Sequence, residues 1–503
     1  MPVPSPKPRI LLAAGLFAGV LQGCMVGPDY EKPDIVTNDA WHGALVAGLE
    51  RSAEGPGAWW EQFDDPILDT LIHRAQSNNL DLRTLMTRVD FARANYGVEE
   101  SYLLPSLSSE GYAIWYRADS GIAPVSGVFQ PTGQAYEVDL GIASWEIDVW
   151  GRVRRQVQAA EQDLLASIED WRDLLISVRA TVAESYISYR TYRRISELLE
   201  VGVAASELAV GLSRQAYENG TIDLQVVLDN ETTLNTLQAT VYEWEARAVN
   251  ELNSISVLLG EAPGHIEELV GIGGKIPYPP STIGVAMPAE VIRQRPDVRA
   301  AERTLAAAVA RLGVAEAELL PKFSLVGSFG FQGDGSSSLT NWSNRTWDIG
   351  PTFSWSIFNW GRVQNEIRAQ KANVQAELID YESTILGALQ EVENSLVNFA
   401  AAELSRRSFQ LSRNNSLQAL VLTSQSYDSG TDNLQDVITS ELQFLEQEFQ
   451  LVDQESAVAL AAVSLYKSTG GDWSPAMPSM DGPIPINVQV SKSGNDENAG
   501  GPQ

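Results

Sequence analysis

Two stretches in the second half of the chain alternate apolar and polar residues, at 323–332 and, after a loop rich in Gly, Ser and Asn, at 346–358. A period of two residues is typical of β-strands that present one apolar face. We therefore expect a hairpin of two strands here. Pro351 lies inside the second stretch and indicates a bulge or an edge strand, because proline cannot donate a ladder hydrogen bond.

The first half contains a less regular version of this pattern, with strands expected at about 106–117 and 135–149. Apolar residues up to Ile142 share one parity, and those from Trp145 onward share the other. A change of parity inside a strand indicates one extra residue. We therefore expect a β-bulge near Ala143 and Ser144.

After each strand hairpin the apolar residues recur at steps of three and four, which is the stripe of an amphipathic helix. No proline interrupts residues 361–467. Because a helix of roughly 65 residues is about 100 Å long, these segments predict long antiparallel helical hairpins with coiled-coil-like packing. Long helices are expected at about 152–218, 222–259, 361–427 and 432–468, and shorter ones before the strands at about 80–103 and 297–319.

The two halves of the chain are copies of one unit. Trp150-Gly151-Arg152 recurs as Trp360-Gly361-Arg362, and Tyr217-x-x-Gly220-Thr221 recurs as Tyr427-x-x-Gly430-Thr431, with the same offset of 210 residues (361 − 151 and 430 − 220). Equal spacing over this distance predicts equal element lengths. The expected organisation is a signal peptide at 1–23, a lipidated N-terminal segment at 24–65, a first repeat at 66–260, a linker at 261–287, a second repeat at 288–473 and a disordered tail at 474–503.

The chain begins with a basic segment, an apolar run at 10–21 and a cysteine, Cys24. This order is typical of a secretory signal peptide, whose apolar run is too short to span a bilayer. Leu21-Gln22-Gly23-Cys24 resembles the bacterial lipobox, in which the cysteine receives lipid such as palmitate and becomes the first residue of the mature protein. The resemblance implies a covalent lipid on Cys24 and, because Met25 rather than Asp follows it, delivery to the cell outer membrane. The alternative is a chance cysteine near a signal.

Charge and strand number restrict what the mature chain can do. There are 65 Asp and Glu against 35 Lys and Arg, a formal net charge of −30, which argues against nucleic acid as a partner and would favour cations in a water-filled passage. After the signal no apolar run reaches about 20 residues, so the chain can span a membrane only with strands that close into a barrel. Bacterial barrels have about eight strands or more. Four strands per chain therefore require several chains in one barrel.

Five segments spread over nearly the whole mature chain resemble the outer membrane factor family, the TolC-like channels, and especially its lipoprotein branch paired with resistance-nodulation-division pumps. They are residues 23–30, 60–66, 144–152, 294–302 and 320–321. The resemblance implies an α+β membrane protein with two tandem repeats, each a β-hairpin plus a long antiparallel α-helical hairpin. It also implies a homotrimer in outer membrane lipid, with a twelve-stranded β-barrel continued by an α-helical barrel in the periplasm.

The same resemblance implies the function and the partners. The expected function is the passive exit duct of a tripartite efflux pump for small molecules, driven by an inner-membrane resistance-nodulation-division pump through a periplasmic adaptor (membrane fusion protein). A duct for type I protein secretion is the alternative within the family. A periplasmic coiled-coil scaffold without a pore is an alternative of a different class.

The repeated Tyr-x-x-Gly-Thr segments fall where one long helix must reverse into the next. Gly at such a place provides a left-handed helix cap and Tyr covers the turn, which accounts for most of the pattern. The resemblance adds that these turns are the periplasmic tips that contact the adaptor. The residues concerned are Tyr217, Gly220, Thr221, Tyr427, Gly430 and Thr431.

Four acids near the tips are candidates for a pore constriction. Asp432 and Asp436 follow the second tip, where the resemblance implies a ring of carboxylates that repels anions and binds cations. An equally weighted reading is a helix-terminal charge that favours the helix dipole. Asp223 and Asp229 are weaker candidates, because they align with Asn433 and Thr439 rather than with the second pair.

The chain offers no support for catalysis, a metal or a cofactor other than the covalent lipid. His42, His73 and His265 are scattered without ligand spacing. Residues 271–275 lack the full spacing of a phosphate-binding loop and indicate a linker. The two Trp-Gly-Arg segments mark the expected joints between strand and long helix.

Overall fold

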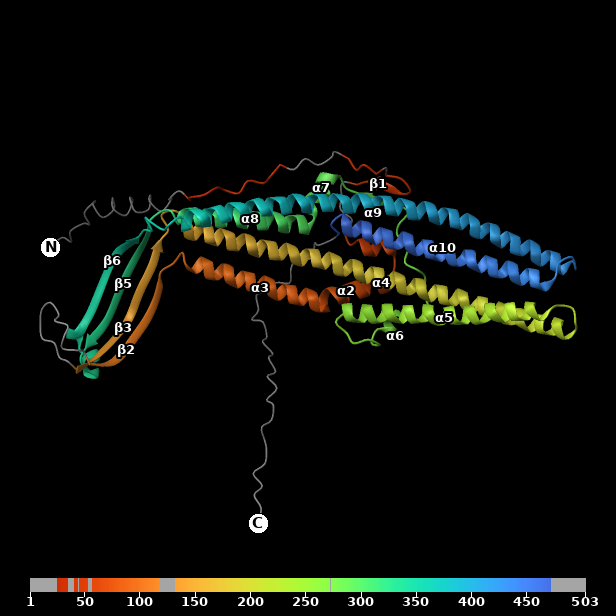
Figure 1. Ribbon diagram of the computed structural model, residues 1–503, viewed down its shortest axis with the longest axis horizontal. Coiled ribbons are helices and arrows are strands. Elements are labelled where there is room, and N and C mark those ends of the chain that lie inside the picture. Colours follow the sequence, from red (N-terminus) through yellow and green to blue (C-terminus); the bar gives the residue numbers. More distant parts are fainter. Residues whose placement is uncertain are drawn as a thin grey trace, which may run out of the picture.

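The computed structural model describes residues 25–34, 40–43, 45–52, 57–117, 132–271 and 273–471. The molecule is elongated, with a β-sheet at one end and long helices that run away from it to two tips at the other end (Figure 1). The signal peptide, Cys24 and the tail after residue 471 lie outside the described residues. Among the helices described, none carries an apolar stretch long enough to cross a membrane.

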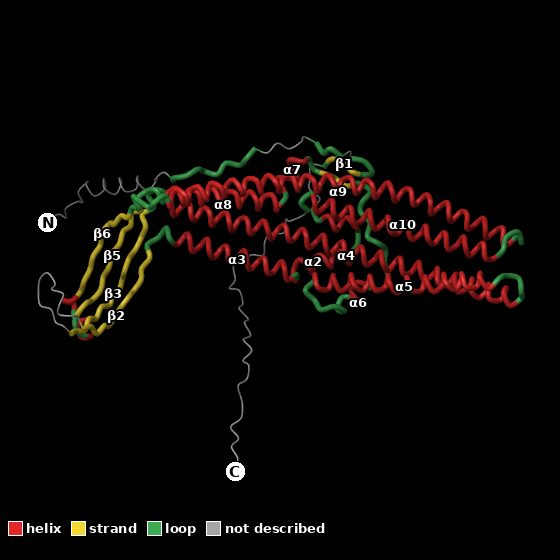
Figure 2. The backbone as a smooth tube through the Cα atoms, viewed as in Figure 1, coloured by secondary structure: helices red, strands yellow, loops and turns green. Residues whose placement is uncertain are grey.

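The sheet is antiparallel and combines both repeats (Figure 2). Its strand order is β2-β3-β5-β6, so the two hairpins join through β3 and β5. Pro351 lies in β6, an edge strand of this sheet, as one of the two expectations for it required. The bounds are Ser106–Arg117 for β2, Thr132–Ile147 for β3, Lys322–Gly333 for β5 and Arg345–Ser354 for β6.

Two details of the strand prediction were wrong. The last strand ends at Ser354 rather than at residue 358. The next residue, Trp355, already leaves the strand pairing, because its indole N–H donates to the carbonyl of Leu319 at the end of a helix. The register shift lies between Asp139 and Gly141, not at Ala143 and Ser144, which pair regularly with β5. The apolar Ile142 lies on the polar face of the sheet, and this placement misled the parity count.

Each repeat contributes a helix of 67 residues and a returning helix of 35 residues, so the element lengths are equal between the repeats. At 1.5 Å per residue a 67-residue helix is about 100 Å long. The returning helices begin two residues later than expected, because Asp223 and Asn433 are their N-cap residues. The bounds are Arg152–Glu218 for α4, Leu224–Leu258 for α5, Arg362–Asp428 for α9 and Leu434–Ser468 for α10.

The helices form one curved layer. In the half next to the sheet the order is α3-α4-α8-α9, and in the half next to the tips it is α5-α4-α10-α9 (Figure 1). The two shorter helices are α3 (Leu80–Ser101) and α8 (Pro296–Ala317). Helix α4 is central and buried along most of its length, whereas α3, α5 and α9 lie at the edges and remain largely exposed.

Short elements form a belt around the middle of the helices. Strand β1 (Leu49–Arg51) pairs in parallel with β4 (Ile283–Val285). In the main core, Trp59 stacks on Tyr466 of α10 with ring centroids 5.3 Å apart. The remaining elements are η1 (Trp59–Phe63), α2 (Pro66–Asn78), α6 (Glu267–Val270) and α7 (Pro288–Gln294), with η2 (Ser336–Thr340) and η3 (Trp342–Asn344) in the loop between β5 and β6. The belt joins the linker and the N-terminal part to both repeats.

Candidate functional site

The two Tyr-x-x-Gly-Thr segments form the turns at the helical tips. In the first turn Gly220 has φ +71°, its N–H donates to the carbonyl of Tyr217 at 2.8 Å, and the N–H of Thr221 donates to the carbonyl of Ala216 at 3.0 Å. This pair of hydrogen bonds is the Schellman cap that satisfies the last carbonyls of a helix. The sequence prediction that these turns are helix caps is confirmed.

The second tip repeats this geometry. Gly430 has φ +77°, and the N–H groups of Gly430 and Thr431 donate to the carbonyls of Tyr427 and Ser426, both at 2.9 Å. Tyr427 is 40% exposed and Tyr217 is 45% exposed, so both rings leave much of their surface open at the free end of the molecule. A partner that contacts the tips would meet these rings.

The four candidate constriction acids all lie at the tips and are exposed, but they differ in their contacts. Asp436 and Asn433 form a capping box, in which each side chain accepts the N–H of the other residue at 3.0 and 3.3 Å. Asp436 therefore has the helix-terminal role that was one of the two roles predicted for it from the sequence. Asp223 is an N-cap residue whose side chain makes no capping bond. The side chains of Asp432 and Asp229 make no hydrogen bond or ion pair with the part of the chain that the structure describes.

At the opposite end, one face of the sheet is apolar and exposed. The strand register places Phe323, Leu325 and Phe329 on the same face as their partners in β6. Several apolar side chains of this end are about 70% exposed: Trp347, Ile349, Phe353, Ile357 and Phe358. A contiguous apolar surface of this kind on an isolated chain marks a surface that another partner or a membrane covers.

The other face of the sheet is polar and carries acids that sequence reasoning missed. Glu110 pairs with Asp139, Tyr112 pairs with Glu137, and Ser328 pairs with Asp348. Only the register brings these carboxylates together, because they come from three strands separated by loops. A signal was present in the alternation itself, since each acid occupies a polar position of its strand.

The joint between strand and long helix differs between the repeats. In the first repeat Asp148 accepts the N–H groups of Val153 and Arg154 at 3.0 and 2.9 Å and so caps α4. Arg152 forms a bidentate ion pair with Glu146 at 2.9 and 2.7 Å. Under the offset of 210 residues, the second repeat has Phe358 and Ser356 at these two places. The first joint is therefore more strongly stabilised than the second.

The N-terminal segment is attached to the first joint by a buried arginine. Arg155 is 1% exposed and donates to the carbonyls of Val26 and Gly27, each at 3.2 Å, and to the carboxylate of Asp29 at 2.8 Å. The N–H of Val26 donates to the carbonyl of Trp150 at 3.0 Å. Met25, the residue after Cys24, therefore lies beside the junction of the sheet and the helices.

Replacing Arg155 by Ala should release this segment. We expect the amide hydrogens of Val26, Gly27 and Asp29 to exchange about ten-fold faster or more, the effect of losing charge-assisted hydrogen bonds of about 1.5–3 kcal/mol. Hydrogen exchange read by mass spectrometry on the purified protein measures this. Arg152→Ala is the control, because it breaks an ion pair at the same joint, and Arg152 makes no hydrogen bond or ion pair to the described residues of the segment. Equal exchange in both variants would contradict the assignment.

The belt contains further fixed polar contacts. Arg190 is 2% exposed and donates to the carbonyls of Val270 and Gly273 at 2.7 and 2.5 Å. The carbonyls of the glycine-rich linker segment thus accept hydrogen bonds from an arginine. A phosphate-binding loop would instead point its N–H groups at an anion. Tyr278 of the linker donates to Glu403 on α9 at 3.0 Å. Although burial opposes it, hydrogen bonds from the neighbouring arginines and Tyr278 lower the pKa of Glu403 to about 2.

No group of three or more His, Cys, Asp or Glu residues within the described ranges has the geometry of a metal site. His73 lies against the Trp60 ring in an edge contact, and His265 bonds to the carbonyl of Ala262. Both positions are packing or surface positions.

Solved structures define the class to which this fold belongs. The outer-membrane channel OprN has a TM-score of 0.81 to this chain at 29% identity, and the match covers 90% of this chain and 100% of that one. An open-state channel, MtrE of Neisseria gonorrhoeae, has a TM-score of 0.78 at 24% identity over 90% of this chain and 99% of that one, and supports the fold alone. The protein is a TolC-like outer-membrane channel, with the expected α+β fold.

Sequence comparison gives the family. The family model described as outer membrane efflux protein matches residues 71–261 and 287–471. Outer membrane protein OprJ of Pseudomonas aeruginosa is 28% identical over 470 residues, which cover 93% of this chain and 97% of that protein. The chain belongs to the outer membrane efflux protein family, and the family resemblance read from the sequence is confirmed.

Proposed function

We propose that the chain is one subunit of a trimeric efflux duct in the outer membrane, in which it acts as a passive exit for small molecules. The observation that carries this proposal is the exposed apolar face of a four-stranded sheet with two unpaired edges, β2 and β6. Open edges are not stable in lipid. Three copies would supply twelve strands, enough to close a barrel.

The helical layer supports the same mode of assembly. The edge helix α9 remains exposed over much of its length, with Leu386, Val397, Leu404 and Leu411 each more than half exposed. The opposite edge, formed by α3 and α5, exposes Phe91, Val249 and Tyr242. Joining the α9 edge of one copy to the α3 and α5 edge of the next continues the wall of a helical barrel below the β-barrel.

The partners proposed are a periplasmic adaptor and an inner-membrane resistance-nodulation-division pump. The printed names of relatives, such as the toluene efflux pump outer membrane protein TtgC of Pseudomonas putida, refer to efflux pumps rather than to protein secretion. These names favour small-molecule efflux over type I secretion. The exposed tip residues Tyr217, Thr221, Tyr427 and Thr431 are the proposed adaptor contacts.

The lipid on Cys24 remains part of the proposal. Arg155 holds the residues that follow Cys24 at the junction of sheet and helices, so a lipid there would enter the membrane beside the barrel. Mass spectrometry of the mature N-terminus measures the added acyl mass. A mature N-terminus at Cys24 without that mass would refute the anchor.

The main test is conduction by the purified full-length protein. We expect detergent-solubilised trimers that dissociate into monomers on heating and that conduct ions in planar bilayers. The scaffold alternative predicts no conductance. A water-soluble monomer without channel activity would overturn the proposed function.

The proposed gate is tested by removing carboxylates from the second tip. Asp432→Ala should raise the single-channel conductance of the isolated trimer, because carboxylates of three copies then no longer hold ions and oppose opening at the constriction. Asp436→Ala should also raise it, with a loss of about 0.5–2 kcal/mol in helix stability from the broken capping box. Conductance equal to that of the wild type in both variants would remove these acids from the gate.

A further inference from the structure

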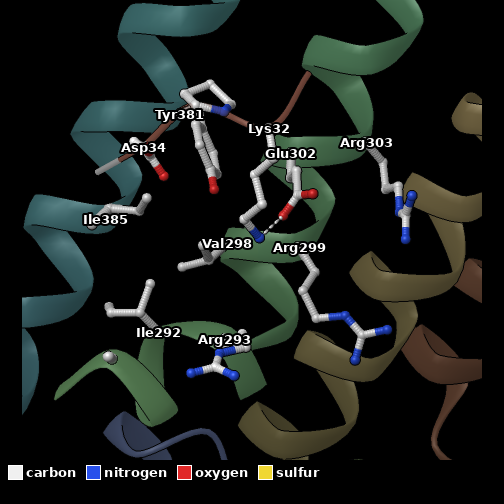
Figure 3. Close-up of a pocket in the computed structure, with 12 residues that line it drawn as sticks. Lys32, Asp34, Ile292, Arg293, Val298, Arg299, Glu302, Arg303, Tyr381 and Ile385 are labelled. Atoms are coloured by element: carbon white, nitrogen blue, oxygen red, sulfur yellow. Dashed lines mark hydrogen bonds and ion pairs between the residues drawn. The ribbon is translucent and has the colours of Figure 1, made fainter. Parts of the chain in front are cut away.

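A cavity of about 550 Å³ lies between the N-terminal segment and helices α7, α8 and α9 (Figure 3). Lys32 enters from the N-terminal segment, Arg293 from α7, Val298 and Glu302 from α8, and Tyr381 from α9. The volume falls within the range of small-molecule sites, about 300–1,000 Å³. The cavity is separate from the tips and from the sheet, so neither of the surfaces already described accounts for it.

Tyr381 provides an unused donor inside this cavity. The residue is 2% exposed and its hydroxyl points into the cavity (Figure 3), yet the described part of the chain offers it no hydrogen-bond partner. The hydroxyl is open to the cavity, so a ligand there can accept a hydrogen bond from it. Burial raises the pKa of Tyr381, so the hydroxyl keeps its proton at neutral pH and remains a donor.

The charges around the cavity favour an anion. Four cationic residues and two acids line it, an excess of two positive charges (4 − 2) in a chain whose net charge is −30. The Glu302 carboxylate is already bound by the ammonium of Lys32 at 2.6 Å. The exposed Arg293 has no ion pair or hydrogen bond within the described residues. The cationic residues are Lys32, Arg293, Arg299 and Arg303, and the acids are Asp34 and Glu302.

Two of these cations have their guanidinium groups bonded elsewhere, so they attract an anion in the cavity only through their charge. Arg299 pairs with Glu169 at 2.7 Å, and Arg303 donates to Gln162 at 3.3 Å, so both heads are held toward α4. Asp34 opposes an anion, because its residue also lines the cavity and carries a negative charge (Figure 3). The groups with unused donors at the cavity are therefore Tyr381, Arg293 and the remaining N–H bonds of Lys32.

Part of the cavity wall is apolar. Ile292, Val298 and Ile385 line it, and all three are less than 10% exposed. A ligand that fills the cavity would place an apolar group against these side chains and a charged group against the donors. Small-molecule sites commonly combine an apolar lining with few polar groups that fix orientation.

We propose that this cavity binds a small organic anion, a carboxylate or phosphate attached to an apolar group. The anionic oxygens accept from the Tyr381 hydroxyl, the Lys32 ammonium and the Arg293 guanidinium, and the apolar group packs on Ile292, Val298 and Ile385. Because Lys32 belongs to the N-terminal segment and Tyr381 to α9, the bound anion links that segment to the second repeat. The site goes beyond the proposed duct and does not depend on it.

Isothermal titration calorimetry on the full-length protein in lipid nanodiscs tests the proposal. Four probes share one ring: benzoate, phenyl phosphate, neutral benzyl alcohol and cationic benzylamine. We expect saturable binding of an anion, with the neutral and cationic probes bound about ten-fold more weakly or worse, the value of one charge-assisted hydrogen bond. Tighter binding of phenyl phosphate than of benzoate identifies the headgroup as phosphate, and the reverse identifies a carboxylate.

Variants assign the binding to this cavity. Tyr381→Phe removes only the hydroxyl, and Arg293→Gln removes one charge, so each should weaken anion binding by about ten-fold. Asp34→Asn should strengthen it. Tyr102→Phe, at a tyrosine that is 58% exposed just after α3, is the matched control and should bind as the wild type does. The proposal is overturned if no anion binds, if benzylamine binds at least as tightly, or if Tyr381→Phe and Arg293→Gln leave binding unchanged.

Discussion

Ile349→Arg should prevent stable insertion of the sheet into the membrane, whereas Thr346→Arg, three residues away on the same strand, should be tolerated. Ile349 is 70% exposed and lies on the apolar face, where the register pairs it with Gly327. Thr346 pairs with Gly330 on the polar face. An arginine that faces lipid costs about 2–4 kcal/mol at the bilayer midplane, while one that faces a water-filled interior costs little.

The measurement is refolding of each variant into lipid vesicles from urea, with the heat-sensitive trimer band on a gel as a second readout. In a trimer the substitution occurs three times, so the expected loss is large. Thr346→Arg is the matched control because it adds the same charge and bulk to the same strand. If both variants insert as well as the wild type, the apolar face does not meet lipid and the barrel proposal fails.

The spacing of apolar residues predicted the strands and helices of this fold, whereas the strand register determines which residues share a face of the sheet. The four strands and four long helices follow from periods of two and of three to four residues, because each element buries or exposes one face. The bulge was misplaced because Ile142, an apolar residue, lies on the polar face. Local hydrophobicity cannot reveal such an exception without the partner strand.

The candidate site was predictable where it depends on local turn chemistry. Gly220 and Gly430 cap helices as the Tyr-x-x-Gly-Thr spacing indicated, since a left-handed residue at a helix end favours glycine. The grouping of acids on the polar face of the sheet, and the cavity around Tyr381, could not be found in this way. Each assembles residues from elements that are distant in sequence, and no short motif encodes their proximity.

The distinction between structural and gating acids also required coordinates. Sequence reasoning gave Asp432 and Asp436 equal weight for the two roles. The capping box gives Asp436 a structural hydrogen bond, whereas the Asp432 carboxylate makes none with the described residues. Asp432 is therefore the acid of this pair whose carboxylate is available to face the pore of the proposed trimer.

Replacing Arg295 by Ala should destabilise the whole helical layer. Arg295 is 7% exposed and bonds in bidentate fashion to Asp297 at 3.0 and 2.7 Å. It also donates to Glu391 of α9 and to the carbonyl of Ser468 at the end of α10, both at 2.7 Å. One guanidinium thus holds the start of α8 and the end of α10 to the edge helix α9.

The expected loss is about 1.5–3 kcal/mol, because the substitution removes charge-assisted hydrogen bonds to Asp297 and leaves the buried carbonyl of Ser468 without its donor. Glu391 is 62% exposed, so its share of the loss is small. Arg295→Lys should recover little of this loss, since an ammonium cannot reproduce the bidentate fork. Arg362→Ala is the matched control: its ion pair with Glu366 at 2.9 Å is more than half exposed and should contribute less than about 1 kcal/mol.

Thermal dissociation and unfolding of the purified protein, followed by circular dichroism, would measure both effects. We expect a clearly lower midpoint for Arg295→Ala and an unchanged one for Arg362→Ala. Arg295 belongs to the segment 294–302 that carries the family resemblance, and its bonds give a physical reason for that pattern. The reason is that Arg295 joins three helices of the second repeat. An Arg295→Ala midpoint equal to that of the control would show that other contacts hold these helices together.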